Sequence, residues 1–241
     1  MFVPLMYHLV DTEVQHAMSV REDEFARQLD WLVTSDITVL SVPEALDLLA
    51  QAVPGVDHRP LVPRVVLTFD DGYRNTVTTV KTMLDERGLR GLMAVCGSYL
   101  DPATTPADIP HASRDFASAA DVRAWLEAGH DIAGHSNTHP RLTELSAVEL
   151  EAEIDIDLQS IAATIGYKPE VFCYPFGKSN KVVRDVVGQR YRYAFVTDGG
   201  SWPAPNQGLA IRRLEVRPAW DLDTFRNEVR AALEAAAGRT F

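Results

Sequence analysis

The sequence has 241 residues, of which 46% are hydrophobic and 24% are charged, a balance typical of an ordinary soluble globular protein. The formal net charge is -11, and no run of Lys or Arg is present, which argues against nucleic acid or an anionic membrane surface as a partner. The length fits one large α/β domain as well as two small ones.

No apolar run reaches the roughly 18 residues that suggest a membrane-spanning helix. The first residues, MFVPLMYHLV, have a strand pattern without the basic and apolar regions of a secretory leader. We therefore expect a cytoplasmic chain as the sequence stands, and a secreted or cell-envelope protein if a leader was removed. The two cysteines, Cys96 and Cys173, each lie in an apolar run, so we expect buried free thiols.

Short β-rich runs alternate with amphipathic helical runs along the chain. The first expected strand, Phe2–Tyr7, is followed by a helix that starts at Ser19 and Glu22, a pair with capping-box spacing. Ser41 and Glu44 have the same spacing and predict the start of the second helix. The other expected elements follow in chain order: a strand over Ile37–Leu40, a loop from Gln51 to Pro63, a strand over Arg64–Phe69, a helix ending at Gly88, a strand over Leu92–Cys96, a loop from Asp101 to Ser113, a helix ending at Gly129, a strand over Asp131–Ala133, a helix from Ser146 to Gly166, strands over Val171–Tyr174, Tyr193–Thr197 and Ile211–Val216, and a last helix over about Asp223–Ala236.

This β–α alternation continues without a break in composition, so we expect one α/β domain spanning residues 1–241. The repeated pattern predicts a largely parallel sheet, which is either a barrel or a doubly wound sheet.

Two adjacent carboxylates, Asp70 and Asp71, follow a very apolar strand and precede Gly72. Burying two like charges side by side is costly, so they need a cation or a proton between them. The carboxyl ends of parallel strands form the active-site face of α/β folds. The alternative is an Asp-Asp-Gly turn at the surface.

His135 and His139 follow the strand expected over Asp131–Ala133. Two imidazoles with this spacing can bind one metal ion if the segment is helical or tightly looped. The alternative is a pair of unrelated surface histidines. Two histidines and one carboxylate would leave open positions on a divalent ion, which a catalytic site requires.

A third segment, Phe172–Gly177, reads as a strand and turn with aromatic packing. Together with the first two, however, it completes a recognisable set: TFDDG, then HSNTH, then a strand ending in YPFG. This order resembles the polysaccharide deacetylases of carbohydrate esterase family four. The opening LMYH, the run AGHDIAGHSNTHPRL and the late strand around Arg213 resemble the bacterial branch that deacetylates poly-N-acetylglucosamine.

The resemblance implies a distorted (β/α) barrel with about seven parallel strands. It makes Asp70 the general base, and it makes Asp71, His135 and His139 the ligands of a divalent metal, usually zinc and in some relatives cobalt or nickel. The metal would polarise the acetyl carbonyl and the attacking water. A backbone N–H in the YPFG turn, that of Phe176, would stabilise the developing oxyanion.

Two positions depart from the family pattern. Many relatives have an arginine at the start of the third motif, where it pairs with the base, but Cys173 occupies that position here. We hypothesise that Arg213 reaches the base instead; the alternative is a plain surface ion pair. Relatives also supply the general acid as a histidine near the C-terminus, and this chain has no histidine after His139. A circular permutation of the motifs would make His8 the acid; the alternative is a packed histidine at a strand end.

Three functions are consistent with these observations. The first is a metal-dependent hydrolase that removes N-acetyl groups from N-acetylglucosamine-type sugars or glycans. The second is a metal-dependent amidohydrolase acting on a non-sugar or small acetylated metabolite, because the fold does not determine the substrate. The third is a non-catalytic carbohydrate-binding relative, for which a base beside a metal would be unnecessary. The sequence gives no indication of oligomeric state.

Overall fold

The computed structural model describes residues 2–14, 17–51, 62–101, 115–199, 202 and 208–238, and its main sheet is parallel throughout. Its strands are β1 (Val3–Tyr7), β4 (Thr38–Leu40), β5 (Arg64–Phe69), β6 (Gly91–Val95), β7 (Asp131–Gly134), β8 (Val171–Cys173), β9 (Tyr193–Val196), β10 (Ile211–Arg212) and β11 (Leu214–Glu215); β2 (Leu9–Val10) and β3 (Ser19–Val20) form a separate parallel pair.

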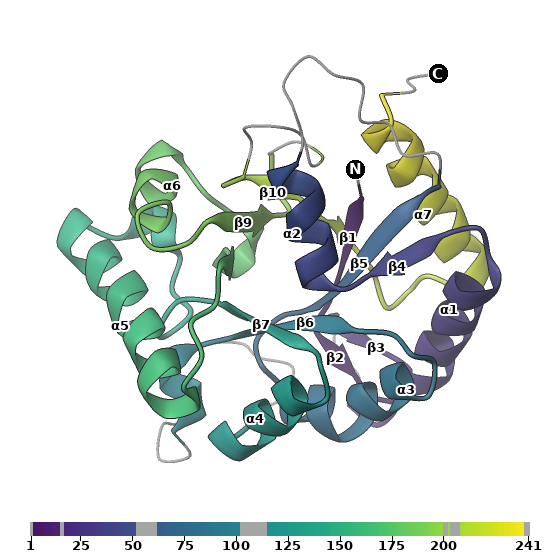
Figure 1. The fold of residues 1–241 in the computed structure, drawn as a ribbon, viewed down its shortest axis with the longest axis horizontal. Coiled ribbons are helices and arrows are strands. Elements are labelled where there is room, and N and C mark those ends of the chain that lie inside the picture. The colour runs from purple at the N-terminus through teal and green to yellow at the C-terminus, as the bar shows by residue number, and fades with distance from the viewer. Residues whose placement is uncertain are drawn as a thin grey trace.

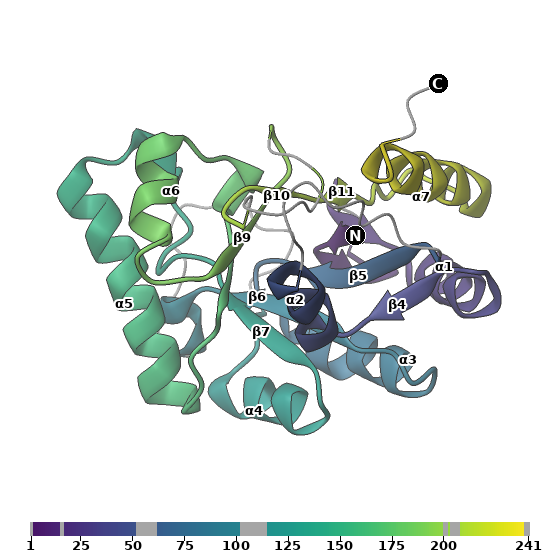
Figure 2. The ribbon, with the colours of Figure 1, turned by 45° about the horizontal axis from the view of Figure 1, so that its top comes forward.

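Helices surround this sheet, as Figures 1 and 2 show. They are α1 (Glu22–Thr34), α2 (Val42–Ala50), α3 (Lys81–Asp85), α4 (Ala119–Glu127), α5 (Ala147–Ile165), α6 (Lys181–Val187) and α7 (Leu222–Ala236). A π-helical segment, η1 (Thr76–Val80), leads directly into α3, and the short 3-10 turns are η2 (Gly97–Leu100), η3 (Leu142–Glu144) and η4 (Pro175–Gly177). Helices α5 and α6 lie on one side of the molecule, and α1 and α7 lie on the other (Figure 1).

The order of the strands shows how the sheet curves into a nearly closed barrel. The path runs β10-β9-β8-β7-β6-β5-β1-β11, and β4 pairs with the first half of β5. Its two ends, β10 and β11, are separated in the chain by Arg213 alone. When β10 and β11 are counted as one interrupted strand, the described path contains seven strands. This arrangement confirms the predicted distorted (β/α) barrel.

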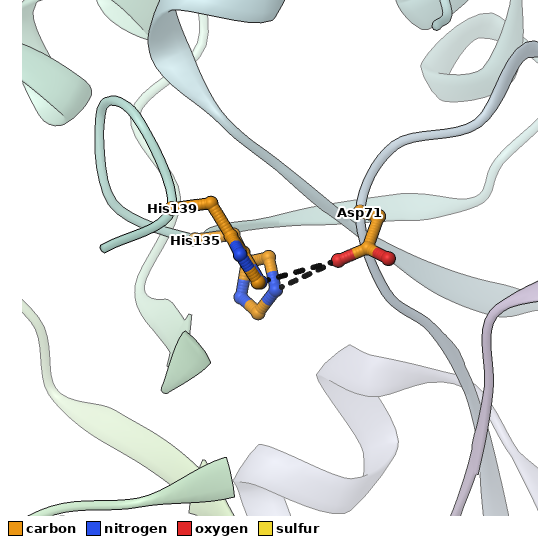
Figure 3. Close-up of side chains that lie close together, drawn as sticks. All are labelled: Asp71, His135 and His139. Atoms are coloured by element: carbon orange, nitrogen blue, oxygen red, sulfur yellow. Dashed lines mark ion pairs between the residues drawn. The ribbon is translucent and has the colours of Figure 1, made fainter. Parts of the chain in front are cut away.

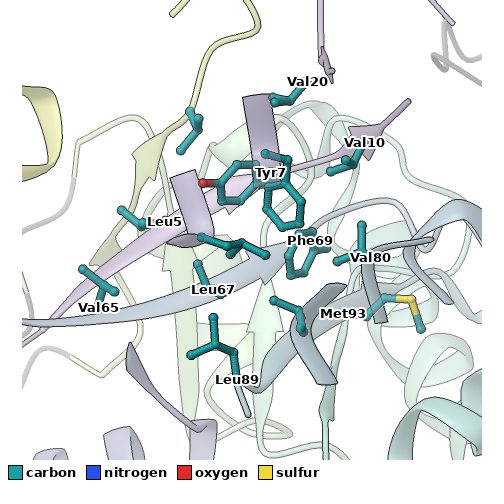
Figure 4. Close-up of a cluster of buried hydrophobic side chains, with 14 of the residues drawn as sticks. Leu5, Tyr7, Val10, Val20, Val65, Leu67, Phe69, Val80, Leu89 and Met93 are labelled. Atoms are coloured by element: carbon teal, nitrogen blue, oxygen red, sulfur yellow. The ribbon is translucent and has the colours of Figure 1, made fainter. Parts of the chain in front are cut away.

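Strand alternation divides the apolar side chains between two sides of the sheet. One inner cluster contains Val66 of β5, Ala133 of β7 and Leu46 of α2. The outward side chains on the same strands, such as Leu67 and Phe69, pack with α1 and the neighbouring helices in a second cluster (Figure 4). A third cluster, which includes Ile154 and Val187, lies between the outer face of β8 and β9 and the helices α5 and α6.

Most of the predicted elements are confirmed to within about two residues at each end, the usual uncertainty of such boundaries. The predicted capping box of Ser41 with Glu44 is present, and Ser146 forms another with Glu149 at the predicted start of α5. Gly166 ends α5 with a left-handed φ of 77°. The two predicted loops, Gln51–Pro63 and Asp101–Ser113, lie for the most part outside the described residues.

Two predictions of local structure were wrong. The first helix begins at Glu22 after Arg21, without a side-chain cap, because Ser19 belongs to β3 and donates its hydroxyl to the carbonyl oxygen of Asp11. The strand predicted over Ile211–Val216 is interrupted at Arg213, where the chain passes from one end of the barrel path to the other.

Both cysteines are buried and free, as predicted. Among the described residues, no helix is long and apolar enough to cross a membrane.

Candidate metal centre and active site

The first motif lies at the carboxyl end of β5. Because side chains alternate along a strand, Thr68 and Asp70 continue the inward-facing row of Val66 beyond the apolar interior. The backbone N–H of Asp70 donates to the carbonyl oxygen of Tyr7 at 2.9 Å, which extends the pairing of β1 with β5. Asp71 then turns with a left-handed φ of 71° and is itself buried. The two carboxylates are therefore part of the barrel mouth and do not form a surface turn.

The second motif brings two imidazoles to Asp71. His135 directly follows β7, and the loop after it carries His139 back to the same place (Figure 3). The Nε2 atoms of His135 and His139 lie 3.4 and 3.3 Å from Oδ1 of Asp71. One potential ligand atom from each of the three buried residues lies within 4.8 Å of the other two. The predicted triad is thus brought together in space.

The tautomer of His135 can be inferred from its second nitrogen. Nδ1 lies 2.6 Å from the carbonyl oxygen of Cys173, which can only accept, so Nδ1 carries the hydrogen. In the neutral ring, Nε2 therefore directs a lone pair toward the Asp71 carboxylate, and only a proton or a cation between them makes this arrangement favourable. Burial lowers the pKa of His135, but the hydrogen bond with Asp71 and the charges of Asp70 and Asp71 raise it above its ordinary value overall.

These donors fit a divalent cation. Two imidazole nitrogens and one carboxylate oxygen, with an imidazole oriented by a backbone carbonyl, are typical of catalytic metal sites that keep open positions. The backbone is consistent with a functional site as well. Among the described non-glycine residues, left-handed φ values occur at Asp71, Ser136, His139 and Phe176. Such conformations are costly and are found preferentially at functional sites.

Asp70 forms a buried ion pair with Arg213. The two guanidinium nitrogens Nη1 and Nη2 donate to Oδ1 and Oδ2 at 2.7 and 2.6 Å, and Nη1 also donates to the hydroxyl of Thr68. Burial raises the pKa of Asp70, but the positive charge of Arg213, then the charge of His135 and the hydrogen bonds from Arg213, hold it below its ordinary value. Arg213 reaches Asp70 as hypothesised, and the pair is not at the surface.

Cys173 lies beside this ion pair, with its Sγ atom 3.5 Å from Nη1 of Arg213. The guanidinium enters from the interruption between β10 and β11, on the inner side of the barrel. The position that the family resemblance assigns to an arginine on β8 is thus adjacent to the arginine that this chain supplies from elsewhere.

The other two predicted residues also lie near this site. His8 is half-buried, immediately follows Tyr7 at the end of β1, and is close enough for its charge to contribute to the lowered pKa of Asp70. Phe176 has a left-handed φ of 58°, and its ring centroid lies 4.8 Å from that of His139. Phe176 is 38% exposed, so the YPFG turn forms part of the rim of the site.

Two acidic residues of α5 lie next to the second motif, and the sequence motifs do not include them. Glu153 contacts the loop between the two histidines, and Asp157 is fully buried beneath it. The carboxylate of Asp157 accepts hydrogen bonds from the N–H of Gly97 and the hydroxyl of Tyr191, both at 2.9 Å. The sequence carries one signal that Asp157 is buried, because it lies three residues after Ile154, on the apolar side of α5.

The stability of the metal-free protein should depend on pH through Asp157. Burial raises the pKa of Asp157 to about 7, although the hydrogen bonds from Tyr191 and Gly97 act in the opposite direction. Between the unfolded pKa near 4 and the folded value, the native state holds a proton that the unfolded state has released. Stability from this group is therefore present at low pH and is lost as pH rises, with a slope approaching about 1.4 kcal/mol per pH unit.

The pH dependence of the free energy of unfolding can be measured by urea unfolding of the wild type and of Asp157→Asn. A series from roughly pH 4.5 to roughly pH 8 covers the window between the two pKa values. The free energy of unfolding of the wild type should fall relative to that of Asp157→Asn as pH rises. Asp47→Asn, which removes an exposed carboxylate, is the control and should follow the wild type. A constant difference between wild type and Asp157→Asn would contradict the assignment.

The fold and the site together define a class: an α/β barrel with a candidate divalent-metal centre and a buried carboxylate beside it at the carboxyl ends of the strands. A profile of the polysaccharide deacetylase family matches residues 58–194, more than half of the chain. The chain belongs to the polysaccharide deacetylase family. The match includes both histidines and both aspartates of the site, and His8 and Arg213 lie outside it.

Individual proteins are also similar to this chain. The peptidoglycan-N-acetylglucosamine deacetylase PgdA of Listeria monocytogenes is 27% identical over 163 residues, which are 67% of this chain and 32% of PgdA, so the chain spans about a third of that relative. The deacetylase PplD of Streptococcus pyogenes, solved in complex with acetate, superposes with a TM-score of 0.77 at 18% identity, over 95% of this chain and 97% of PplD. IcaB from Ammonifex degensii also gives 0.77 at 18% identity, over 98% of this chain and 97% of IcaB. These two structural similarities establish the fold.

Proposed function

We propose that this protein is a metal-dependent hydrolase that removes N-acetyl groups from N-acetylglucosamine-type sugars or glycans and releases acetate. The observation that carries the proposal is the buried triad of Asp71, His135 and His139, with ligand atoms within 4.8 Å of one another. Membership of the polysaccharide deacetylase family supports a carbohydrate substrate. The name of PgdA, a peptidoglycan-N-acetylglucosamine deacetylase, supports N-acetylglucosamine as the sugar.

In this proposal, Asp71, His135 and His139 hold the metal, which is zinc by preference, with cobalt or nickel as alternatives. When bound, a divalent metal of this kind supplies Lewis-acid polarisation and lowers the pKa of water. The ligand set suits all three ions, because imidazole and carboxylate together do not discriminate strongly among them.

The remaining chemistry is assigned to residues of this chain. Asp70 takes a proton from the attacking water as general base, and Arg213 keeps its carboxylate ionised and aimed across the barrel mouth. The backbone N–H of Phe176 stabilises negative charge that develops on the acetyl oxygen. His8 donates a proton to the leaving amine, so that the sugar departs with a neutral amino group.

His8→Ala is expected to lower kcat by about 10²–10⁴-fold, because the leaving amine would no longer receive a proton from a positioned acid. Metal content should stay equal to that of the wild type, since His8 is not a member of the triad. Acetate release and metal analysis on the same preparation measure both quantities. A His8→Ala protein with full metal and a near-normal rate would leave His8 as a packed histidine at a strand end.

The substrate class is tested by comparing acetate release from N-acetylglucosamine oligomers with that from small acetylated amines. We expect release from the oligomers and little from the amines. The reverse result would favour the alternative, an amidohydrolase acting on a small acetylated metabolite. Binding of oligomers without any acetate release, in protein loaded with zinc, would favour a non-catalytic carbohydrate-binding protein. A cell-envelope substrate would be consistent with the name of PgdA.

A further inference from the structure

Helix α5 lies directly behind the loop that carries the two histidines, and one of its side chains binds the middle of that loop. The carboxylate of Glu153 accepts hydrogen bonds from the backbone N–H and the hydroxyl of Thr138, at 2.9 and 2.8 Å. The backbone carbonyl of Glu153 accepts a third, from the N–H of Asn137 at 3.2 Å. Glu153 therefore contacts two of the three residues between His135 and His139.

This loop needs such support because its backbone conformation is unfavourable. Ser136 and His139 have φ values of 66° and 61°, in the left-handed region that residues with a Cβ rarely occupy. The bond from the N–H of His139 to the hydroxyl of Ser136, at 3.1 Å, closes the turn from within. A local hydrogen bond of this kind does not determine how far the turn stands from Asp71 on β5, so that distance must be set by contacts from outside the loop.

The opposite side of the loop is held by the short turn η2. The backbone N–H and the hydroxyl of Ser98 both donate to the carbonyl oxygen of Asn137. Asp157, one turn after Glu153 on the same helix, accepts from the N–H of Gly97. A Cβ at Gly97 would lie 2.9 Å from the Cα of Asp157, so helix and turn are in close contact. The loop is thus clamped between α5 and a turn that α5 itself holds in place.

We propose that Glu153 is a positioning residue that sets the approach of His139 toward Asp71 and so determines the metal affinity of the site. This inference rests on the proposed function, because it takes the triad to be a metal site. Glu153 is not itself one of the three proposed metal ligands. It acts through Thr138, which directly precedes His139, in the way that residues outside a metal's ligand set commonly tune affinity.

Zinc dissociation constants measured by competition with a chromophoric chelator test the proposal. Glu153→Ala should weaken zinc binding about 10–100-fold, the range found for residues that orient metal ligands. Glu153→Gln should recover most of the affinity, because an amide can still accept from the N–H of Thr138 and donate to its hydroxyl. Glu151→Ala removes an exposed carboxylate from the same helix and should leave zinc affinity at the wild-type value.

Thermal melting of the metal-free variants separates positioning from loss of folding. Glu153→Ala and Glu151→Ala should melt within a few degrees of each other. If Glu153→Ala does not fold, Thr138→Val, which deletes one of the bonds, should raise the dissociation constant by a smaller factor. If folded Glu153→Ala binds zinc with wild-type affinity, the inference about Glu153 is overturned while the proposed metal site stands. If only Thr138→Val folds, the same result in that variant has the same meaning. Absence of zinc binding by the wild type overturns the proposed metal site and this inference together.

Discussion

Asp70→Asn should lower kcat by about 10²–10⁴-fold, the contribution typical of a general base. Asparagine has nearly the same shape but cannot take a proton from water. The substitution does not remove any of the three proposed ligand atoms, so zinc stoichiometry should remain that of the wild type. Initial rates of acetate release from N-acetylglucosamine oligomers, together with metal analysis of the same sample, measure the two quantities.

Asp70→Asn leaves the buried positive charge of Arg213 without its carboxylate partner, so the control must remove that charge as well. Asp70→Asn/Arg213→Met removes both members of the pair and should be as inactive as the single variant. A substantial rate in fully metallated Asp70→Asn would mean that another group takes the proton.

Arg213→Met should reduce the free energy of unfolding by about 3–5 kcal/mol, because it leaves the carboxylate of Asp70 buried without its partner. The guanidinium donates to both oxygens of Asp70, so its loss removes two hydrogen bonds as well as the charge. Turnover should fall sharply, since Asp70 loses the contact that aims it, and bound metal should remain unchanged. Urea unfolding and steady-state rates test the two effects.

Arg190→Met provides a matched control, because Arg190 makes a similar two-nitrogen contact with Asp155 on α5, where the carboxylate is 41% exposed. Exposed pairs contribute little, so this control should cost about 0–1 kcal/mol. The double variant Asp70→Asn/Arg213→Met should recover part of the stability lost in Arg213→Met. If Arg213→Met costs no more than the control and retains normal turnover, the ion pair contributes neither to stability nor to the reaction.

The core of the site could be predicted from the sequence because its residues follow parallel strands. Asp70 and Asp71 follow β5, and His135 follows β7, so the topology alone brings them to the same end of the barrel. The contact of Arg213 with Asp70 was a hypothesis that the geometry confirms. The catalytic and metal-binding roles of these residues stay predictions.

The supporting residues could not be predicted in the same way. Glu153 and Asp157 lie on α5, and their contacts depend on how that helix is rotated against β7 and η2, which no local pattern specifies. The wrong capping box at Ser19 has a similar origin. Its spacing to Glu22 is correct, but the pairing of β3 with β2 places Ser19 in a strand, and this tertiary contact outweighs the local preference.

The central claim is that the protein is a metal-dependent deacetylase, and acetate release from N-acetylglucosamine oligomers tests it most directly. One preparation is assayed as purified, after dialysis against a strong chelator, and after addition of one equivalent of Zn²⁺. We predict that activity disappears with the metal and returns with zinc, and that a His135→Ala/His139→Ala protein regains none of it. Undiminished acetate release by protein shown to contain no metal would contradict the proposal that Asp71, His135 and His139 form the metal centre of a deacetylase.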